Sequence, residues 1–278
     1  ARTEVEVTLH QEPHRSRGVD AVQTYVDIGL VILKEELQGG YTLVAYAERT
    51  NESLVHASAS LEQDAHTSRY LTVPICFGHM ISSQPRKFRL AVHGTNPLAM
   101  QTEALPAATM ATATILLVIA KGERKAVLSH PVLGDALVMY KMEDEAGVIL
   151  VAENPSQFPM RIEVDASEHT SGFVSSRGPL YCQDILAPST RQLLIVFSRD
   201  SRAKKFSFGY GIGGGIAETG SATGHIPALS DLGQLQALHE PQPISQFGFG
   251  GAALQDASTG MSDMSELASM LWNSQARQ

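Results

Sequence analysis

Residues 70–100 read YLTVPICFGHMISSQPRKFRLAVHGTNPLAM, and this stretch carries the clearest indication of the fold. Residues 70–77 form an apolar run of strand length. Residues 88–93 alternate Phe, Leu and Val with Arg, Ala and His, which is the period-two pattern of a strand with one buried face. Glycine, serine and proline residues lie between the two segments and are typical of turns. The stretch therefore predicts two strands joined by a turn.

The same pattern extends in both directions along the chain. Short strand-like segments without amphipathic helices between them occur at 3–11, 23–33, 41–46, 54–60, 69–76 and 87–93. A second set occurs at 112–120, 125–129, 135–142, 148–153, 160–165, 191–198 and 205–210, with 178–188 expected to be a loop. Short strands at regular spacing predict sandwiches. We therefore expect an all-β fold with two consecutive antiparallel β-sandwich domains, at 1–100 and 112–210, joined by a low-complexity linker at 101–111.

The composition changes abruptly after residue 210. Residues 211–278 are rich in Gly, Ser, Ala and Gln, and they carry one basic residue against six acidic residues. This composition favours a flexible acidic tail, because such a segment cannot build a core of its own. Leucines at every third position in 230–240 and apolar residues at helical spacing in 262–275 predict one or two short helices within the tail.

The second of these helices is the strongest local candidate for a binding element. Its apolar stripe consists of Met264, Leu267 and Leu271, with Trp272 beside it. A stripe of this kind can dock in a groove on a partner protein. It can equally fold back on the chain's own sandwich, and the sequence leaves both alternatives open.

Composition and charge exclude several classes of function. The chain has 278 residues, is 43% hydrophobic and carries a formal net charge of -8, so we expect no nucleic-acid partner. Its longest apolar run, 114–120, is far shorter than the roughly 20 residues of a membrane helix, so a membrane partner is not expected.

Two cysteines, Cys76 and Cys182, are expected to be reduced, which favours a cytoplasmic protein. Because the chain opens in the middle of a strand pattern without a methionine, we expect a fragment of a longer protein.

Several stretches resemble calpains. EVEVTLHQ (4–11), YVDIGLVILK (25–34) and GGYTLVAYAERTNESLVHASASLE (39–62) resemble strands of the sandwich that follows the protease core, and 70–94 resembles its late hairpin. SGFVSSRGPLYCQDILAPSTRQLLIVFSR (171–199) resembles the C-terminal homology region of the small optic lobes (SOL) type of calpains. The resemblance covers about residues 3–205 and implies a cysteine endopeptidase. Its catalytic core, with a Cys nucleophile and His and Asn partners, would precede residue 1.

None of that catalytic set carries over to this chain. Cys76 lies in a buried type of strand, and Cys182 has Asp184 nearby but no histidine close in sequence. The segment GYGIGG (209–214) matches a dinucleotide-binding pattern, but no helix pattern follows it, so we interpret it as a flexible linker. We therefore expect neither a catalytic residue nor a cofactor in this chain.

One acidic turn is a weak candidate for calcium binding. It consists of Glu143, Asp144 and Glu145. Calcium takes six to eight oxygen ligands, usually from converging loops, and a second loop is not evident here. A solvated turn is the simpler interpretation. Any calcium dependence of the intact protease is an implication of the resemblance and would reside mainly in the protease core.

These observations favour a non-catalytic, regulatory and protein-binding role, as the C-terminal part of a calpain-like intracellular endopeptidase. Its partners would be the protease core in cis, a protein captured by the tail helix, or both. The alternative is a stand-alone adaptor or assembly subunit that uses the sandwich as a binding scaffold. A lipid-binding module is a third alternative, which the acidic balance disfavours.

Overall fold

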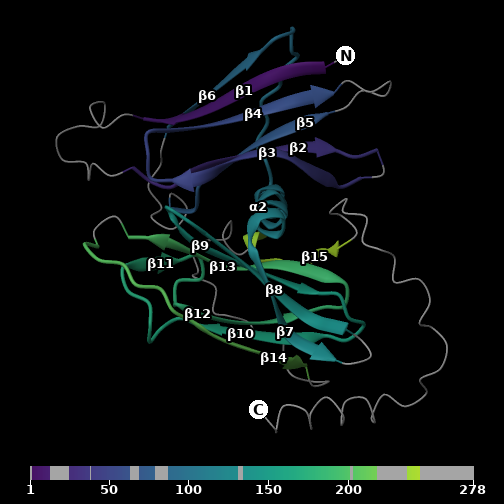
Figure 1. Ribbon diagram of the computed structural model, residues 1–278, viewed down its shortest axis with the longest axis vertical. Helices are drawn as coiled ribbons and strands as arrows, with labels where there is room; N and C mark the ends of the chain where they lie inside the picture. The colour runs from purple at the N-terminus through teal and green to yellow at the C-terminus, as the bar shows by residue number, and fades with distance from the viewer. Residues whose placement is uncertain are drawn as a thin grey trace.

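Antiparallel strands dominate the computed structural model, which describes residues 2–12, 25–37, 39–62, 69–78, 87–130, 134–200, 203–217 and 237–244. The strands form two sandwiches stacked on either side of helix α2 (Ala107–Lys121), as Figure 1 shows. The predicted all-β class with two consecutive antiparallel sandwiches is confirmed.

The first sandwich consists of two three-stranded sheets. One has the order β4 (Leu54–Glu62), β1 (Arg2–Gln11), β6 (Phe88–Gly94), and the other the order β3 (Tyr41–Thr50), β2 (Ile28–Glu35), β5 (Tyr70–Ile75). Alternate residues of each sheet point inward. The core between them consists of Val5, Val7, Leu9, Ile28, Leu30, Ile32, Val55, Ala57 and Ala59.

The second sandwich pairs a six-stranded sheet with a three-stranded sheet. The larger sheet has the order β11 (Phe173–Ser175), β13 (Thr190–Arg199), β9 (Gly147–Asn154), β8 (Gly134–Asp144), β7 (Glu123–His130), and β15 (Gln242–Pro243) pairs with β13. The smaller sheet has the order β12 (Tyr181–Leu186), β10 (Met160–Asp165), β14 (Gly211–Ile216). Their shared core includes Leu137, Met139, Leu150, Phe197, Met160, Ile162, Val164 and Cys182.

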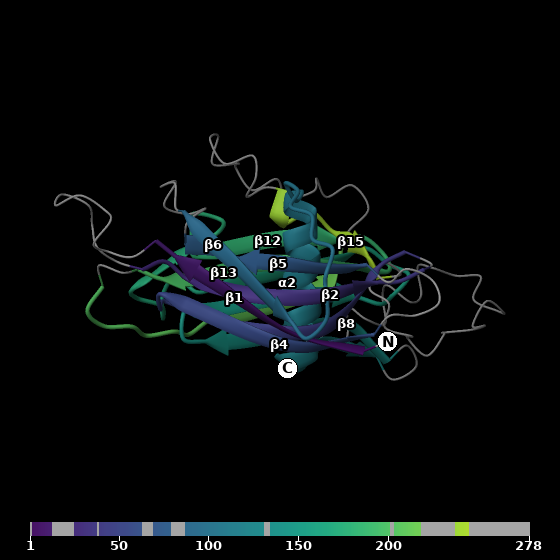
Figure 2. The same cartoon turned by 90° about the horizontal axis from the view of Figure 1, so that it is seen from above.

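Helix α2 forms a middle layer between the sandwiches. It packs against the outer face of sheet β3-β2-β5 on one side and against the six-stranded sheet on the other. Seen from above, β2 and β5 lie over α2, with β8 and β13 beyond it (Figure 2). We call this layer the seam, meaning α2 together with the two sheet faces that it contacts. The seam unites the two sandwiches through one continuous hydrophobic core.

The prediction of a strand at 112–120 is wrong, because these residues lie in helix α2. The second half of the predicted linker, from Ala107 onward, belongs to the same helix. The run TILLVIA is apolar without a period, and such a run fits a buried helix as well as a buried strand. Its helical form therefore depends on being covered from both sides, which the sequence does not display.

Three further expectations about the second sandwich are wrong. The glycine-rich start of the predicted flexible tail, Gly211–Ile216, is strand β14 and pairs with β10. The predicted loop at 178–188 contains strand β12. The predicted strand at 205–210 is largely irregular, with one isolated bridge from Ser207 to Ser171.

The two strands of residues 70–100 exist, but they do not pair with each other. Strand β5 pairs with β2, and β6 pairs with β1 in the opposite sheet of the sandwich. The two strands therefore belong to different sheets, and residues 79–86 of the predicted turn lie outside the described residues. The expectation of a late hairpin is wrong for this reason.

The predicted tail helices are described only in part. Within 230–240 the structure describes residues from Ala237 onward, and Ala237 and Leu238 are helical. The predicted helix at 262–275 lies outside the described residues.

Candidate functional site

The seam depends on a helix that is apolar on every side. Residues 111–118 of α2 are all buried. A helix of this kind is stable only when it is covered all round. Its cover comes from Val31, Leu33, Val73, Ile75 and Phe77 of the first sandwich and from Val138, Ile149, Val151, Leu193 and Val196 of the second. Separating the sandwiches would therefore expose the helix and both sheet faces to water.

A buried ion cluster crosses the seam beside this apolar layer. Arg49 of β3 donates from Nε and Nη2 to the two carboxylate oxygens of Asp144, at 2.9 and 3.0 Å. Its Nη1 donates to Asp27 Oδ2 at 3.1 Å. The side chains of all three residues are at most 1% exposed. Because Asp144 ends strand β8, the cluster joins the first sandwich to the second.

Backbone amides complete the cluster. Asp27 accepts hydrogen bonds from the N–H groups of Phe77 and Gly78, and Asp144 accepts one from Gly147 N at 2.9 Å. Burial raises the pKa of the Asp144 carboxyl, and the Arg49 guanidinium opposes that rise. Two carboxylates thus share one guanidinium out of contact with water, an arrangement that is sensitive to loss of any member.

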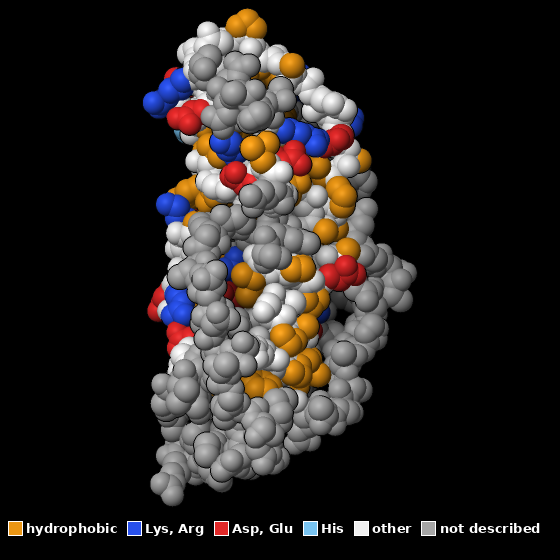
Figure 3. Space-filling model, turned by 90° about the vertical axis from the view of Figure 1, so that its right-hand side faces the viewer, with side chains coloured by type: hydrophobic (Ala, Val, Ile, Leu, Met, Phe, Trp, Pro, Cys, Tyr) orange, Lys and Arg blue, Asp and Glu red, His pale blue; other side chains and the backbone are white. Residues whose placement is uncertain are grey.

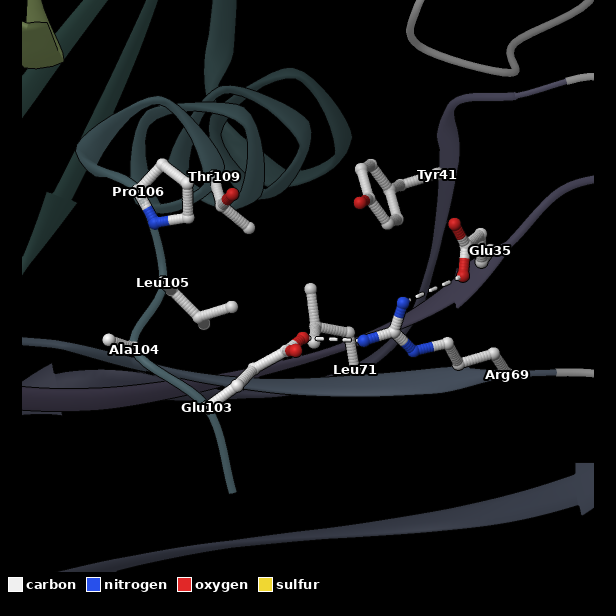
Figure 4. Close-up of a pocket in the computed structure, with 9 residues that line it drawn as sticks. All are labelled: Glu35, Tyr41, Arg69, Leu71, Glu103, Ala104, Leu105, Pro106 and Thr109. Carbon is white, nitrogen blue, oxygen red and sulfur yellow. Dashed lines mark hydrogen bonds and ion pairs between the residues drawn. The ribbon is translucent and has the colours of Figure 1, made fainter. Parts of the chain in front are cut away.

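A pocket of about 280 Å³ lies beside the start of α2 (Figure 4). Its walls are Glu35, Tyr41, Arg69 and Leu71 of the first sandwich, together with Glu103, Ala104, Leu105, Pro106 and Thr109. Arg69 contacts Glu103 and lies 3.6 Å from Glu35. These side chains are 40–58% exposed, so each ion pair contributes at most about 1 kcal/mol. The guanidinium of Arg69 already pairs with two carboxylates, so the pocket does not offer it to an anionic ligand.

The three calcium candidates do not converge on one point. Glu143 is exposed and pairs with Lys141 at 2.9 Å, and Glu145 is exposed. Asp144 is buried with both oxygens on Arg49, so the expectation of a solvated turn is wrong for this residue. Within the described ranges, no group of three or more His, Cys, Asp and Glu side chains could hold a metal ion.

The cysteines are free thiols in different surroundings. Cys182 is 1% exposed within the second core, and burial raises its pKa to about 12. A thiol with such a pKa stays protonated at neutral pH and is a poor nucleophile. Cys76 is half-buried, with Sγ 3.9 Å from Asp27 Oδ1.

The predicted partner-binding stripe lies outside the described residues. This applies to Met264, Leu267, Leu271 and Trp272. Docking through this stripe therefore stays a prediction.

Charges of both signs are mixed over the surface of the first sandwich. On the face shown in Figure 3, Lys and Arg side chains lie close to Asp and Glu side chains over its upper part. Several ion pairs contribute to this mixture, including Arg2 with Glu4 and Arg69 with Glu103.

The fold and the seam define a β-sandwich module built around a structural helix. A comparison with known families finds a match for its second sandwich. Residues 117–217 match the family model described as Calpain-D-like, C-terminal domain. The match runs from within α2 to just beyond β14, and it confirms the resemblance to the C-terminal, non-catalytic region of calpains. No solved structure matches the chain. No helix in the described part of the chain combines the length and the apolar character needed to cross a membrane.

Sequence reasoning missed the residues that join the two sandwiches. One signal was present, because Arg49 is a cation at the end of the otherwise strand-like segment YTLVAYAERT. Its partner Asp144 is 95 residues away, and nothing local in the sequence connects them.

Proposed function

We propose that this chain is the non-catalytic, regulatory and protein-interaction part of a calpain-like cysteine endopeptidase of the cytoplasm. The observation that carries the proposal is the match of residues 117–217 to the Calpain-D-like C-terminal domain. Its role would be to support and orient a protease core and to present binding surfaces for protein partners.

The rigidity of the seam is consistent with a role in holding a protease core in place. The two sandwiches share one hydrophobic core through α2, and the Arg49 cluster ties them together a second time. Relative movement of the sandwiches would expose apolar surface and break buried ion pairs. The chain would therefore act as one stiff arm, which can hold a second domain or partner in a defined orientation.

The composition of the protein in cells tests this proposal most simply. The endogenous protein is purified with an antibody against the first sandwich, and its intact mass and upstream peptides are determined. We expect a mass well above the 29.9 kDa of this chain, with Cys, His and Asn blocks of a papain-like core in the additional sequence. A mass near 29.9 kDa would refute the protease arm and favour the stand-alone adaptor.

The regulatory part of the proposal needs a second experiment, on the longer protein. Arg49→Met weakens the seam, whereas Arg124→Met removes an exposed ion pair with Asp135 within the second sandwich. We expect the first variant to change peptidase activity at a temperature where it remains folded, and the second to leave activity unchanged. Equal activity of both variants and the wild type would argue against regulation through the arm.

A further inference from the structure

A short segment from beyond β14 packs against α2 and the start of β13, and we call the surface that it covers the groove. Residues 237–244, which we call the docked segment, run beside the start of β13 and against α2. Leu238 is 0% exposed and belongs to the same core as α2. Strand β15 of this segment pairs with β13, with Thr190 opposite Pro243 and Arg191 opposite Gln242.

The groove exists because strand β13 has an open side at its start. On that side β11 pairs with β13 only at residues 197–199. The N-terminal end of β13 is left to other partners, and an uncovered strand edge is a template for an added strand. Ser189, at the turn before β13, has a φ of 54°, a conformation that non-glycine residues adopt rarely and that often marks functional positions. Its carbonyl accepts a hydrogen bond from Ile244 N at 3.0 Å, so this turn contributes directly to the groove.

Side chains as well as backbone recognise the docked segment. The ring Nδ1 of His239 lies 2.7 Å from the Leu193 carbonyl, and Gln192 Nε2 donates to the His239 carbonyl at 2.6 Å. The Thr112 hydroxyl of α2 donates to Gln242 Oε1 at 2.7 Å. His239 and Gln242 are only 5% and 7% exposed. The contacts of the His239 ring and the Gln242 side chain depend on the residue at those two positions, whereas the Gln192 contact is to the backbone.

The arrangement has the parts of a peptide-recognition site. The leucine side chain is buried in the core beside α2, the histidine ring contacts a backbone carbonyl, and the glutamine side chain contacts Thr112 of α2. Pro241 and Pro243 favour an extended backbone, which suits strand addition and lowers the entropy lost on docking.

We propose that the groove between α2 and the start of β13 is a peptide-binding site that the chain's own residues 237–244 occupy in the free state. Its ligand class is a protein segment with the pattern Leu-His-x-Pro-Gln-Pro, in which the Gln-Pro pair adds to β13 as a short strand. A partner that carries this pattern displaces the docked segment and takes its place by strand addition. The inference rests on the groove alone and holds whether or not a protease core is present.

The docked segment competes with any added peptide for the groove. The docked segment belongs to the same chain as the groove, so its binding is intramolecular and its effective concentration exceeds that of a dilute added peptide. An added peptide therefore competes poorly with the wild-type chain and binds well once the docked segment has been released.

The test uses the full chain and a fluorescent peptide of residues 235–246. Leu238→Asp places a charge in the apolar pocket and should release the docked segment, whereas Leu37→Asp alters a side chain that is 82% exposed and serves as the control. By fluorescence anisotropy, we expect the Leu238→Asp chain to bind the peptide at least tenfold more tightly than the wild type or the control. A peptide with His239→Ala and Gln242→Ala should bind at least tenfold more weakly than the native peptide. A folded Leu238→Asp chain that takes up no peptide, or equal uptake by all three chains, would overturn the proposal.

A second measurement covers the case in which Leu238→Asp fails to fold. A specific protease site is placed within 225–230 of the otherwise wild-type chain. After folding, cleavage at this site separates the docked segment covalently from the two sandwiches. We expect the cut chain to exchange its docked segment for the labelled peptide, and the uncut chain to exchange at least tenfold less. Absence of exchange after cutting, with peptide in excess, would mean that the segment is a permanent part of the fold.

Discussion

Replacing Arg49 by methionine should destabilise the protein far more than the loss of an ordinary ion pair. Methionine keeps an apolar side chain but removes three charge-assisted hydrogen bonds, two to Asp144 and one to Asp27. Both carboxylates then stay buried without a cation, with backbone N–H partners and, for Asp27, the Cys76 thiol. Breaking a buried pair in this way costs about 3–5 kcal/mol, because an uncompensated charge is left out of contact with water.

The assay is equilibrium unfolding in urea, followed by circular dichroism. Arg124→Met is the matched control, since Arg124 and Asp135 are 52% and 31% exposed and their pair should contribute at most about 1 kcal/mol. Adding Asp144→Asn to Arg49→Met should recover about 1–3 kcal/mol, because the second change removes one orphaned charge. A loss for Arg49→Met no larger than that of the control would refute the seam cluster as a major stabilising element.

Three other predictions concern single sites. Gly147→Ala should lower the free energy of unfolding in urea by more than about 2 kcal/mol, because the φ of Gly147 is +151° and an added Cβ would lie 1.9 Å from a backbone oxygen. Gly134→Ala is the comparison: its φ is +70° but the space around it is open, so it should lower the free energy of unfolding by about 1–2 kcal/mol. Cys182 should stay unlabelled by a thiol reagent in the native state and react on unfolding, since burial raises its pKa to about 12; rapid native labelling would contradict this. Burial lowers the pKa of His239 to about 3, so between its ordinary value of about 6.5 and pH 5 only the released segment takes up the proton, and docking should weaken by about 2 kcal/mol. Limited proteolysis should show this release at pH 5 in the wild type and a flatter pH dependence in His239→Gln.

Most strands could be predicted because each one carries its own pattern. In β1, alternate residues Val5, Val7 and Leu9 are buried, as the alternation of RTEVEVTLHQ indicates. Strand β10 behaves in the same way, with Met160, Ile162 and Val164 buried. A local pattern is sufficient when one face of a strand is buried and the other meets water.

Helix α2 and strand β14 could not be predicted, because their environment decides their structure. The apolar run of α2 is covered on both sides, so the amphipathic signal that identifies a surface helix is missing. Strand β14 is rich in glycine, which disfavours strands in isolation. At Gly214 an added Cβ would lie 2.7 and 2.8 Å from Leu137 and Val127, so close packing, rather than flexibility, explains this glycine.

The candidate sites show the same limit. The neighbours of Asp144 indicate an acidic turn, whereas the side chain of Asp144 pairs with Arg49, far away in the sequence. Leucine spacing predicts a helix that includes Leu238, and Leu238 is helical, but the spacing does not indicate that this side chain is buried in the core beside α2. Pairings across the seam depend on how the two sandwiches stack, and that stacking has no local signature.

Hydrogen–deuterium exchange of helix α2 tests most directly whether the two sandwiches form one body. Exchange is measured by mass spectrometry over residues 107–121, with β2 and β9 as reporters of the first and second sandwich. A single body predicts that all three segments exchange with the same free energy of opening and lose protection together as urea is raised. Early exchange of α2, or loss of protection in β2 well before β9, would contradict the seam as the element that unites the protein.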